Sequence, residues 1–405
     1  MGKYNFDEIV DRRNTNSLNV EGWRSYIFGE GYTKEFPFKD EEFIRMWVAD
    51  MEFAVAPEIC DAIKARVDKR IFGYTRLYSE DYYNALRNWC ESRYGWSFPK
   101  EELVISSGVV PIIYQVVENL VKEDEKILFL TPSYGPFKIS AEFNNVSYVE
   151  SPLLIEDGKF LIDYDDLDQK LADPKVKLLI FCNPHNPTGR VWTEEELKKV
   201  AELVEKHDKW ILSDEIHCDL VRVGNHHIPM GKIMPDYTKL ITGMAASKTF
   251  NIAGLLYANV IIRDPEQRNK FMSRDKISNL YNPLSIAAHQ AAYEKGGEWL
   301  EELSEYLDGN FSFLKSFLDE YLPETNYTVA ESTYLAWVNL KPYLGDLQDY
   351  TEFFAERAGV LLEGGDKLFV GNAEGYVRLN LAMPRATLKI GMERIRDAIY
   401  EYKGL

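Results

Sequence analysis

Cysteine and histidine are scarce in this 405-residue chain, which contains four cysteines and six histidines. The cysteines are Cys60, Cys90, Cys182 and Cys218. Because they are scattered and form no C-x-x-C pair, we expect reduced thiols that pack as small apolar side chains. The histidines show no spacing typical of zinc ligands, and the pair His226 and His227 is most simply part of a solvated loop. The sequence therefore predicts neither a disulfide framework nor a metal site.

Positive charge is also in short supply, since 47 lysines and arginines stand against 65 aspartates and glutamates, a formal net charge of −18. Such a surface repels phosphate backbones and anionic lipids, which argues against nucleic acid and membrane partners. No apolar run approaches the length of a membrane span, and residues 1–8 carry charges where a signal peptide needs an apolar core. We therefore expect a cytoplasmic protein that holds small anionic ligands by local features.

Short apolar runs that alternate with amphipathic segments predict the fold of the first two thirds of the chain. The expected strands are residues 103–105, 127–130, 178–181, 210–212, 240–241 and 257–262. These runs are almost wholly apolar, as is typical of strands covered by helices on both faces. The predicted fold class is α/β with a mostly parallel sheet, and the direction of the last strand stays open.

The pattern changes after about residue 282, where helical periodicity is followed by a mixture of short strands and helices. This mixture predicts a second, smaller α+β domain. We therefore divide the chain into an amino-terminal arm (1–50) that packs on the small domain, a large α/β domain (51–285) and a small carboxyl-terminal domain (286–405).

The stretch Thr242-Gly-Met-Ala-Ala-Ser-Lys-Thr-Phe-Asn-Ile-Ala-Gly254 is the most informative of the chain. It follows a short run rich in β-formers, so Lys248 is predicted to lie just past a buried strand that ends in a tight loop. Small and apolar neighbours would partly desolvate the amine, lower its pKa and make it a nucleophile. A Schiff-base lysine needs these properties. A surface lysine in a loop is the alternative from this segment alone.

Other chemistry-bearing residues also follow predicted strands, and ligands of open α/β sheets bind beyond the carboxyl ends of the strands. Gly108, Val109 and Val110 open a predicted helix, whose free N–H groups and dipole would hold a phosphate. Tyr134 lies between prolines in a predicted turn, where it could offer an aromatic face to a flat ring. The alternative is a tyrosine that packs in a surface turn. Asn186 lies in an Asn-Pro-His-Asn-Pro-Thr-Gly loop and can donate to a phenolic oxygen.

An acid at a strand end completes this set. Asp214 follows the expected strand 210–212 and can pair with a protonated ring nitrogen, although capping of the next helix is the alternative. His217 lies three residues further on and could reach the same ligand. Thr193 with Glu196 three residues later forms a capping box, so this threonine is expected to be structural.

The order of these elements, aromatic residue, Asn-Pro-Thr-Gly loop, carboxylate and lysine, resembles the fold-type I pyridoxal-phosphate enzymes of the class I/II aminotransferase superfamily. Within that superfamily the chain is most similar to the cystathionine β-lyase branch of the MalY/PatB and cystalysin type. The resemblance extends over nearly the whole chain and implies a seven-stranded sheet. It includes the motifs Trp47-Val-Ala-Asp-Met51, Phe72-Gly-Tyr-Thr75, Ser247-Lys-Thr-Phe-Asn-Ile-Ala-Gly254 and Val377-Arg-Leu-Asn-Leu-Ala382.

Position by position, the resemblance implies the contacts of a pyridoxal 5′-phosphate cofactor. Lys248 would form the Schiff base, Asp214 would keep the pyridine nitrogen protonated, and Tyr134 would stack on the ring. Asn186 and His217 would contact the ring hydroxyl.

The resemblance also implies how phosphate, substrate and a second subunit are held. Gly108 to Val110 and Ser247 would hold the phosphate. Tyr74 matches the family tyrosine that reaches the phosphate and substrate of the neighbouring subunit's site, which implies a homodimer. Arg378 matches the arginine that clamps the substrate α-carboxylate, a bidentate task suited to a guanidinium.

Several positions depart from the family patterns. Leu256 stands eight residues after the lysine, where aspartate aminotransferases have a phosphate-binding arginine, and Ala245 stands three residues before it. The phosphate must therefore rely more on backbone donors. The motif Glu331-Ser-Thr-Tyr334 replaces the usual Glu-Gly-Thr-Tyr of the branch.

The activity implied is α,β-elimination from cystathionine or other cysteine S-conjugates to pyruvate, ammonia and a thiol. Lys248 would remove the Cα proton, and Tyr134 would protonate the departing thiolate. Transamination by a class I/II aminotransferase is the first alternative, because it shares the same first step. A pyridoxal-phosphate-binding regulatory protein that acts through a partner is the second.

Overall fold

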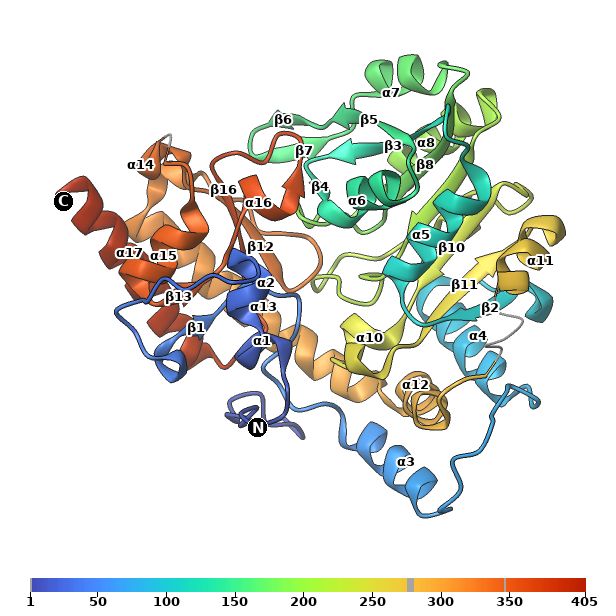
Figure 1. The fold of residues 1–405 in the computed structure, drawn as a ribbon, viewed down its shortest axis with the longest axis horizontal. Helices are drawn as coiled ribbons and strands as arrows, with labels where there is room; N and C mark the ends of the chain where they lie inside the picture. Colours follow the sequence, from blue (N-terminus) through green and yellow to red (C-terminus); the bar gives the residue numbers. More distant parts are fainter. Residues whose placement is uncertain (1, 275–279, 346) are drawn as a thin grey trace.

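A seven-stranded sheet forms the centre of the computed structural model, which describes residues 2–274, 280–345 and 347–405 (Figure 1). In spatial order its strands are β2 (Leu103–Ser106), β11 (Ala258–Ile262), β10 (Leu240–Met244), β9 (Trp210–Asp214), β8 (Val176–Cys182), β3 (Lys126–Thr131) and β5 (Ser147–Pro152). Only β11 runs antiparallel to its neighbours within this described sheet. The mostly parallel α/β sheet is therefore confirmed, and the direction left open for the last strand is antiparallel.

Helices cover both faces of this sheet, as the apolar character of its strands predicted. One face packs against α5 (Val109–Leu120), α6 (Gly135–Phe143) and α11 (Pro265–Arg274). The other packs against α7 (Tyr164–Leu171), α8 (Glu194–Lys206) and α9 (Met230–Ile233). Thr193 caps α8 in the predicted capping box with Glu196.

Three local features differ from what the sequence predicts. Strand β5 was not predicted, and β10 continues to Met244, beyond the expected strand 240–241. Tyr134 lies in a two-residue strand, β4 (Ser133–Tyr134), and not in a turn, because it pairs with β15 (Phe369–Val370) from far along the chain.

A second group of elements follows the large sheet along the chain. Strands β12 (Leu335–Asn339), β16 (Tyr376–Asn380) and β14 (Glu363–Gly364) form an antiparallel sheet. Residues of α13 (Gly297–Tyr321), α15 (Tyr350–Ala358) and α17 (Arg385–Lys403) pack against it in one apolar core. These are the elements of the smaller α+β part, while the boundaries given above remain a prediction.

The amino-terminal segment contains short regular elements. It contains the short helices α1 (Leu18–Glu21) and α2 (Trp23–Phe28), which lie among the elements of the second group in Figure 1. Strand β1 (Ile44–Arg45) pairs in parallel with β13 (Val360–Leu361). Backbone hydrogen bonds thus join this segment to a strand in the carboxyl-terminal part of the chain.

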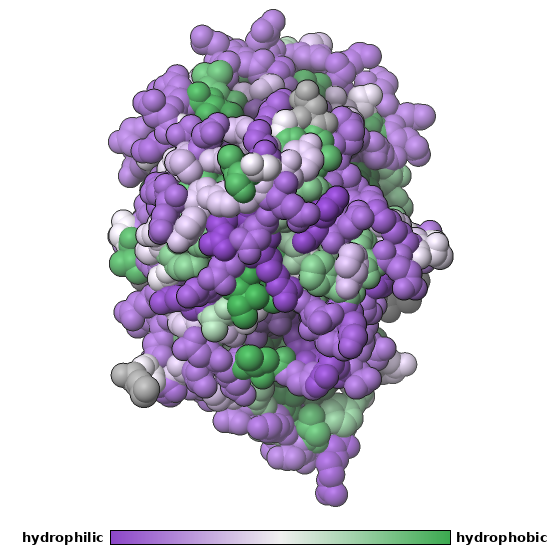
Figure 2. Space-filling view, turned by 90° about the vertical axis from the view of Figure 1, so that its left-hand side faces the viewer, coloured by the Kyte–Doolittle hydropathy of each residue, from purple (hydrophilic) through white to green (hydrophobic). Residues whose placement is uncertain are grey.

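The surface fits the acidic composition. The face turned toward the viewer in Figure 2 is mostly hydrophilic, with hydrophobic residues gathered in small separate groups. Within the described ranges, no helix is both long enough and apolar enough to cross a bilayer. All four cysteines are free thiols, as predicted from their spacing.

Candidate active site

A cavity of about 280 Å³ lies where β8, β9 and β10 end, at the edge of the sheet where ligands were expected. Ten residues proposed from the sequence line it. They are Gly108, Val109, Val110, Tyr134, Asn186, Asp214, His217, Ser247, Lys248 and Arg378. Tyr74 is separate: its side chain is 93% exposed, in the segment between α3 (Pro57–Val67) and α4 (Asp81–Tyr94). The structure thus brings together ten of the eleven predicted site residues.

Lys248 lies on α10 (Ala246–Thr249), a single helical turn that follows β10 directly. We expected a loop here, and the helical turn aims the lysine back at the sheet edge. Its amine is partly buried and donates a hydrogen bond to the carbonyl oxygen of Ala49 at 2.7 Å. Burial lowers the pKa of the Lys248 ammonium group. The neutral, nucleophilic form is therefore more accessible than for a solvated lysine.

Asp214 is the last residue of β9, between β8 and β10 in the middle of the sheet. It does not cap a helix; its Oδ1 accepts a hydrogen bond from the backbone N–H of Ile216 at 3.3 Å. Burial raises the pKa of the Asp214 carboxyl group to about 7. A cation beside it would restore the charged form, since an opposite charge offsets the cost of desolvation.

His217 and Asn186 present polar atoms to the same cavity. Burial lowers the pKa of the His217 imidazole to about 3, so its ring is neutral. Its buried Nδ1 has no hydrogen-bond partner among the described residues. Asn186 accepts a hydrogen bond on Oδ1 from Nη1 of Arg378 at 3.3 Å, which leaves its Nδ2 as a donor.

The amino terminus of α5 lines the opposite end of the cavity. Gly108 precedes the helix, and the first N–H groups of any helix lack partners within it. Ser247 adds a hydroxyl from α10, and Leu256 stands at the rim with its side chain 67% exposed. This end therefore offers backbone donors and a hydroxyl, with no arginine at position 256, as its sequence indicated.

Arg378 enters the cavity from β16 and is buried, with 2% of its surface exposed. Its Nη2 donates to the carbonyl oxygen of Trp47 at 3.3 Å and forms an ion pair with Glu363. The guanidinium also lies over the ring of Phe369, 5.1 Å from the centroid. A planar, fully charged donor is thus fixed in orientation at the cavity wall.

Buried hydrogen bonds position the helical turn that carries Lys248. Thr249 donates from Oγ1 to Oδ2 of Asp219 at 2.9 Å, and Oδ1 of Asp219 accepts from Nε1 of Trp89 at 2.9 Å. Tyr94 also hydrogen bonds to Asp219. This carboxylate lies five residues after Asp214 in the sequence. It therefore ties α10 to the segment that follows β9.

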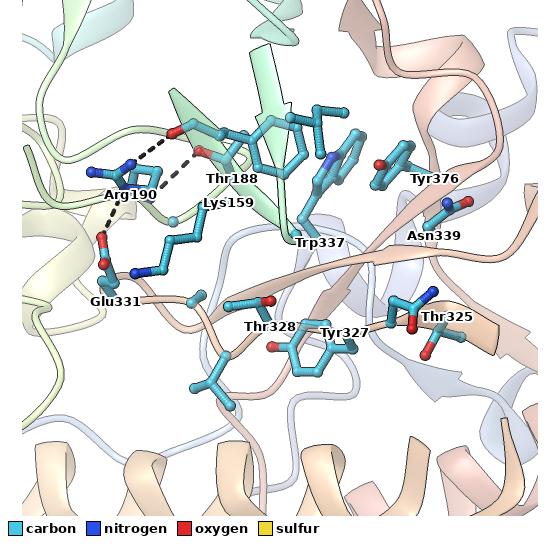
Figure 3. A pocket seen from close by; sticks show the side chains of 17 residues that line it. Lys159, Thr188, Arg190, Thr325, Tyr327, Thr328, Glu331, Trp337, Asn339 and Tyr376 are labelled. Carbon is cyan, nitrogen blue, oxygen red and sulfur yellow. Dashed lines mark hydrogen bonds and ion pairs between the residues drawn. The ribbon is translucent and has the colours of Figure 1, made fainter. Parts of the chain in front are cut away.

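The Asn186 loop is fixed from its outer side, beside a second pocket of about 260 Å³ (Figure 3). Arg190 donates from Nε to Glu331 at 3.0 Å and from Nη1 to the carbonyl oxygen of Phe160 at 2.6 Å. Its Nη2 donates to Glu196 at 2.9 Å. Glu331, at the start of a motif that departs from the family pattern, therefore fastens this loop.

Sequence reasoning missed several residues of the cavity wall: Tyr26, Val48, Ala49, Glu363 and Leu368. Tyr26 and Ala49 come from the amino-terminal segment, and no local pattern marks a backbone carbonyl as a partner for a lysine. Glu363 could have been found from the sequence, because it is a charged residue within the apolar run 359–364.

The cavity fits an anionic, planar, aromatic cofactor that carries an aldehyde. Donors at the start of α5 suit a phosphate, and the carboxylate of Asp214 suits a protonated ring nitrogen. The Nδ1 of His217, which has no hydrogen-bond partner among the described residues, and the amide donor Nδ2 of Asn186 suit a ring oxygen. Lys248 lines the same cavity as these groups and the guanidinium of Arg378. The hydrogen-bond donors of the cavity therefore match such a cofactor, although no cationic side chain at position 256 is available to its phosphate.

Comparison with known proteins extends this agreement to the whole chain. The family model for aminotransferase class I and II matches residues 41–395. The chain is 36% identical to cystathionine beta-lyase PatB of Bacillus subtilis, over 98% of this chain and 100% of that protein. It is 30% identical to protein MalY of Escherichia coli, over 98% and 99%.

Solved structures agree with these relatives. A PLP-bound C-S lyase from Staphylococcus hominis, complexed with L-cycloserine, superposes with a TM-score of 0.94 at 46% identity and covers 98% of each chain. The match to the family model spans both the large sheet and the antiparallel sheet of the second group. The chain belongs to the aminotransferase class I and II family.

Proposed function

We propose that the protein is a pyridoxal 5′-phosphate-dependent C–S β-lyase. It cleaves cystathionine or other cysteine S-conjugates to pyruvate, ammonia and a thiol. The observation that carries this proposal is that Lys248, Asp214 and Arg378 line one and the same cavity. The chain is also similar over 98% of its length to a cystathionine β-lyase and to a C-S lyase.

Bound pyridoxal phosphate supplies an aldehyde that bonds an amine and a ring that withdraws electrons from the substrate Cα. The residues that hold it are those of the cavity. The start of α5 and Ser247 take the phosphate, Asp214 pairs with the ring nitrogen, and Asn186 with His217 takes the ring oxygen. The buried carboxylate of Asp214 keeps that nitrogen protonated, because a negative charge close to the ring nitrogen stabilises its protonated, positively charged form.

Two side chains move protons. The Lys248 amine is the general base for the Cα proton, and the lowered pKa of its ammonium group makes the neutral amine available. Tyr134 donates a proton to the departing thiolate. Burial raises the pKa of the Tyr134 hydroxyl, so this group carries its proton in the resting site. Arg378 orients the substrate through its carboxylate.

A homodimer completes the site in this proposal. Tyr74 extends from an exposed segment that also presents Ile71 (69% exposed), Phe72 (56%) and Tyr78 (83%). Contiguous exposed apolar side chains are typical of surfaces that a partner covers. The partner copy supplies the same tyrosine to this cavity by two-fold symmetry.

The test is incubation of the cofactor-loaded protein with cystathionine, with thiol and pyruvate measured separately. Equal amounts of both products are expected, and Lys248→Ala should abolish their release. Conversion of the cofactor to its pyridoxamine form, reversed by a 2-oxoacid and without release of thiol, would contradict the proposal and assign a transaminase. Normal cofactor binding with neither reaction would assign a regulatory binding protein.

A further inference from the structure

The substrate-facing arginine already holds a carboxylate of the protein. Strands β14 and β16 pair so that Glu363 stands directly opposite Arg378. Both side chains are buried, with 8% and 2% of their surfaces exposed, and their charged groups form an ion pair. Glu363 also lines the cavity that contains Lys248. It therefore lies at the place where the carboxylate of an amino acid would have to dock.

The geometry of the guanidinium makes the two carboxylates competitors. A carboxylate binds arginine in a bidentate manner either through Nη1 and Nη2 or through Nε and Nη2, so both arrangements need Nη2. In this structure Nη2 contacts Glu363 and the carbonyl oxygen of Trp47. Nε has no hydrogen-bond partner among the described residues. Bidentate docking therefore requires that one of these two contacts of Nη2 be released. Glu363 is the partner that carries a charge of the same sign as the substrate carboxylate.

The charge balance explains how this release occurs. The ionisable groups that face Glu363 are Arg378 on β16, Lys248 on α10, Tyr26 on α2 and Tyr134 on β4. One guanidinium cannot compensate two buried carboxylates, and like charges at a shared site disfavour each other. Burial raises the pKa of the Glu363 carboxyl group to about 7, so a proton is available to it near neutral pH.

We propose that Glu363 stands in for the substrate α-carboxylate on Arg378 in the empty site and yields to it by taking up one proton from solvent. Glu363 is thus a positioning residue that keeps the buried guanidinium in place and makes amino-acid binding weaken as pH rises. This inference rests on the proposed role of Arg378 in carboxylate binding. It does not depend on which reaction follows.

The test measures the binding of glycine to the cofactor-loaded protein between pH 6 and pH 8. Binding is monitored through the visible absorbance of the cofactor. Wild type, Glu363→Gln and the control Asp349→Asn are compared. Asp349 pairs with Lys367 near the same strand, and asparagine preserves its capping of α15. Dividing the dissociation constants of wild type by those of Glu363→Gln removes the titration of glycine itself.

We expect that this ratio rises roughly tenfold between pH 6 and pH 8, because each pH unit above the pKa of Glu363 costs about a factor of ten. The control should follow the wild type. Glu363→Ala should reproduce the result if the glutamine variant does not fold. In steady state, the KM for cystathionine should change in the same way while kcat does not.

A ratio that stays constant with pH would overturn the inference, as would weaker glycine binding by Glu363→Gln at every pH. These failures are distinct from failure of the lyase assignment. A wild type that binds glycine with the expected pH dependence but releases no thiol would refute the proposed function alone.

Discussion

At the scale of single residues, burial sets the protonation of the site. The pKa of Asp214 rises from 3.8 to about 7 because the carboxyl group is buried. Since the folded state holds this proton more tightly than the unfolded chain, the group costs the cofactor-free protein stability as pH rises from about 4 to about 7. Above about pH 7 its contribution no longer changes.

Asp214→Asn should remove this pH dependence. Between pH 5 and pH 7.5 the melting temperature of the cofactor-free variant is expected to fall less than that of the wild type, by about 2 °C or more. Thermal unfolding of both proteins, freed of cofactor, measures the difference. If the melting temperatures of the two proteins fell equally with pH, the buried carboxyl group of Asp214 would not be the cause of the pH dependence. The loaded variant should also bind cofactor more weakly, since the ring nitrogen loses its charged partner.

Arg378 combines substrate binding with the orientation of Asn186. Arg378→Lys keeps the positive charge but loses the planar fork, so the substrate carboxylate is held by a point charge. We expect an increase of roughly 10- to 100-fold in the KM for cystathionine, corresponding to about 1.4–2.8 kcal/mol of lost binding. Steady-state kinetics with saturating cofactor measure this change. A large fall in kcat with KM unchanged would instead place Arg378 in the chemical step.

At the scale of elements, the site depends on how short segments are anchored. Helix α10 is a single turn and cannot be stable alone, because helix formation needs a longer run of hydrogen bonds. Its position depends on the bond from Thr249 to Asp219. Thr249→Val should lower the free energy of unfolding by about 1–3 kcal/mol, since a buried acceptor loses its donor. It should also lower kcat more than it raises KM.

Thr249→Ser is the matched control, because it keeps the hydroxyl and removes one methyl group. It should retain most of the wild-type kcat. Chemical denaturation and steady-state kinetics of both variants measure these effects. Equal losses in the serine and valine variants would mean that packing of the methyl group, and not the hydrogen bond, fixes the helix.

The sequence predicted those elements whose pattern is local. Six strands were placed because they are continuous apolar runs, and several lining residues were found because they follow those strands. Ser247 and Arg378 were identified from the family resemblance. The missed strand β5 lies at the edge of the sheet, where partial exposure of its side chains breaks up the apolar pattern. Similarly, Tyr134 was assigned to a turn because its strand partner, β15, is more than 230 residues away in the chain.

The role of Glu363 was beyond prediction for a related reason. The contact between Glu363 and Arg378 depends on the cross-strand register, which places the two residues opposite each other. The register between strands that are distant in the chain cannot be read from a single sequence. The same holds for Ala49, whose carbonyl oxygen accepts from Lys248 across 199 residues of chain.

At the scale of the whole molecule, the exposed segment between α3 and α4 leads to a prediction about assembly. Tyr74→Ala should weaken binding of pyridoxal phosphate roughly 10- to 100-fold while the mass in solution stays that of a dimer, because one hydrogen bond to a charged group is worth roughly 1.5–3 kcal/mol. Light scattering and cofactor titration measure the two quantities. Tyr78→Ala is the control on the same segment. A monomeric wild type, or equal effects of both variants, would contradict the assignment.

The proposed function depends above all on Lys248, whose amine we propose bonds the cofactor and removes the Cα proton. Reduction of the loaded protein with borohydride, followed by digestion and mass spectrometry, shows which amine bonds the cofactor. The cofactor mass is expected on the peptide containing Lys248, and Lys248→Ala should show no adduct and no turnover. An adduct on a different lysine, or undiminished release of thiol by Lys248→Ala, would contradict this proposal.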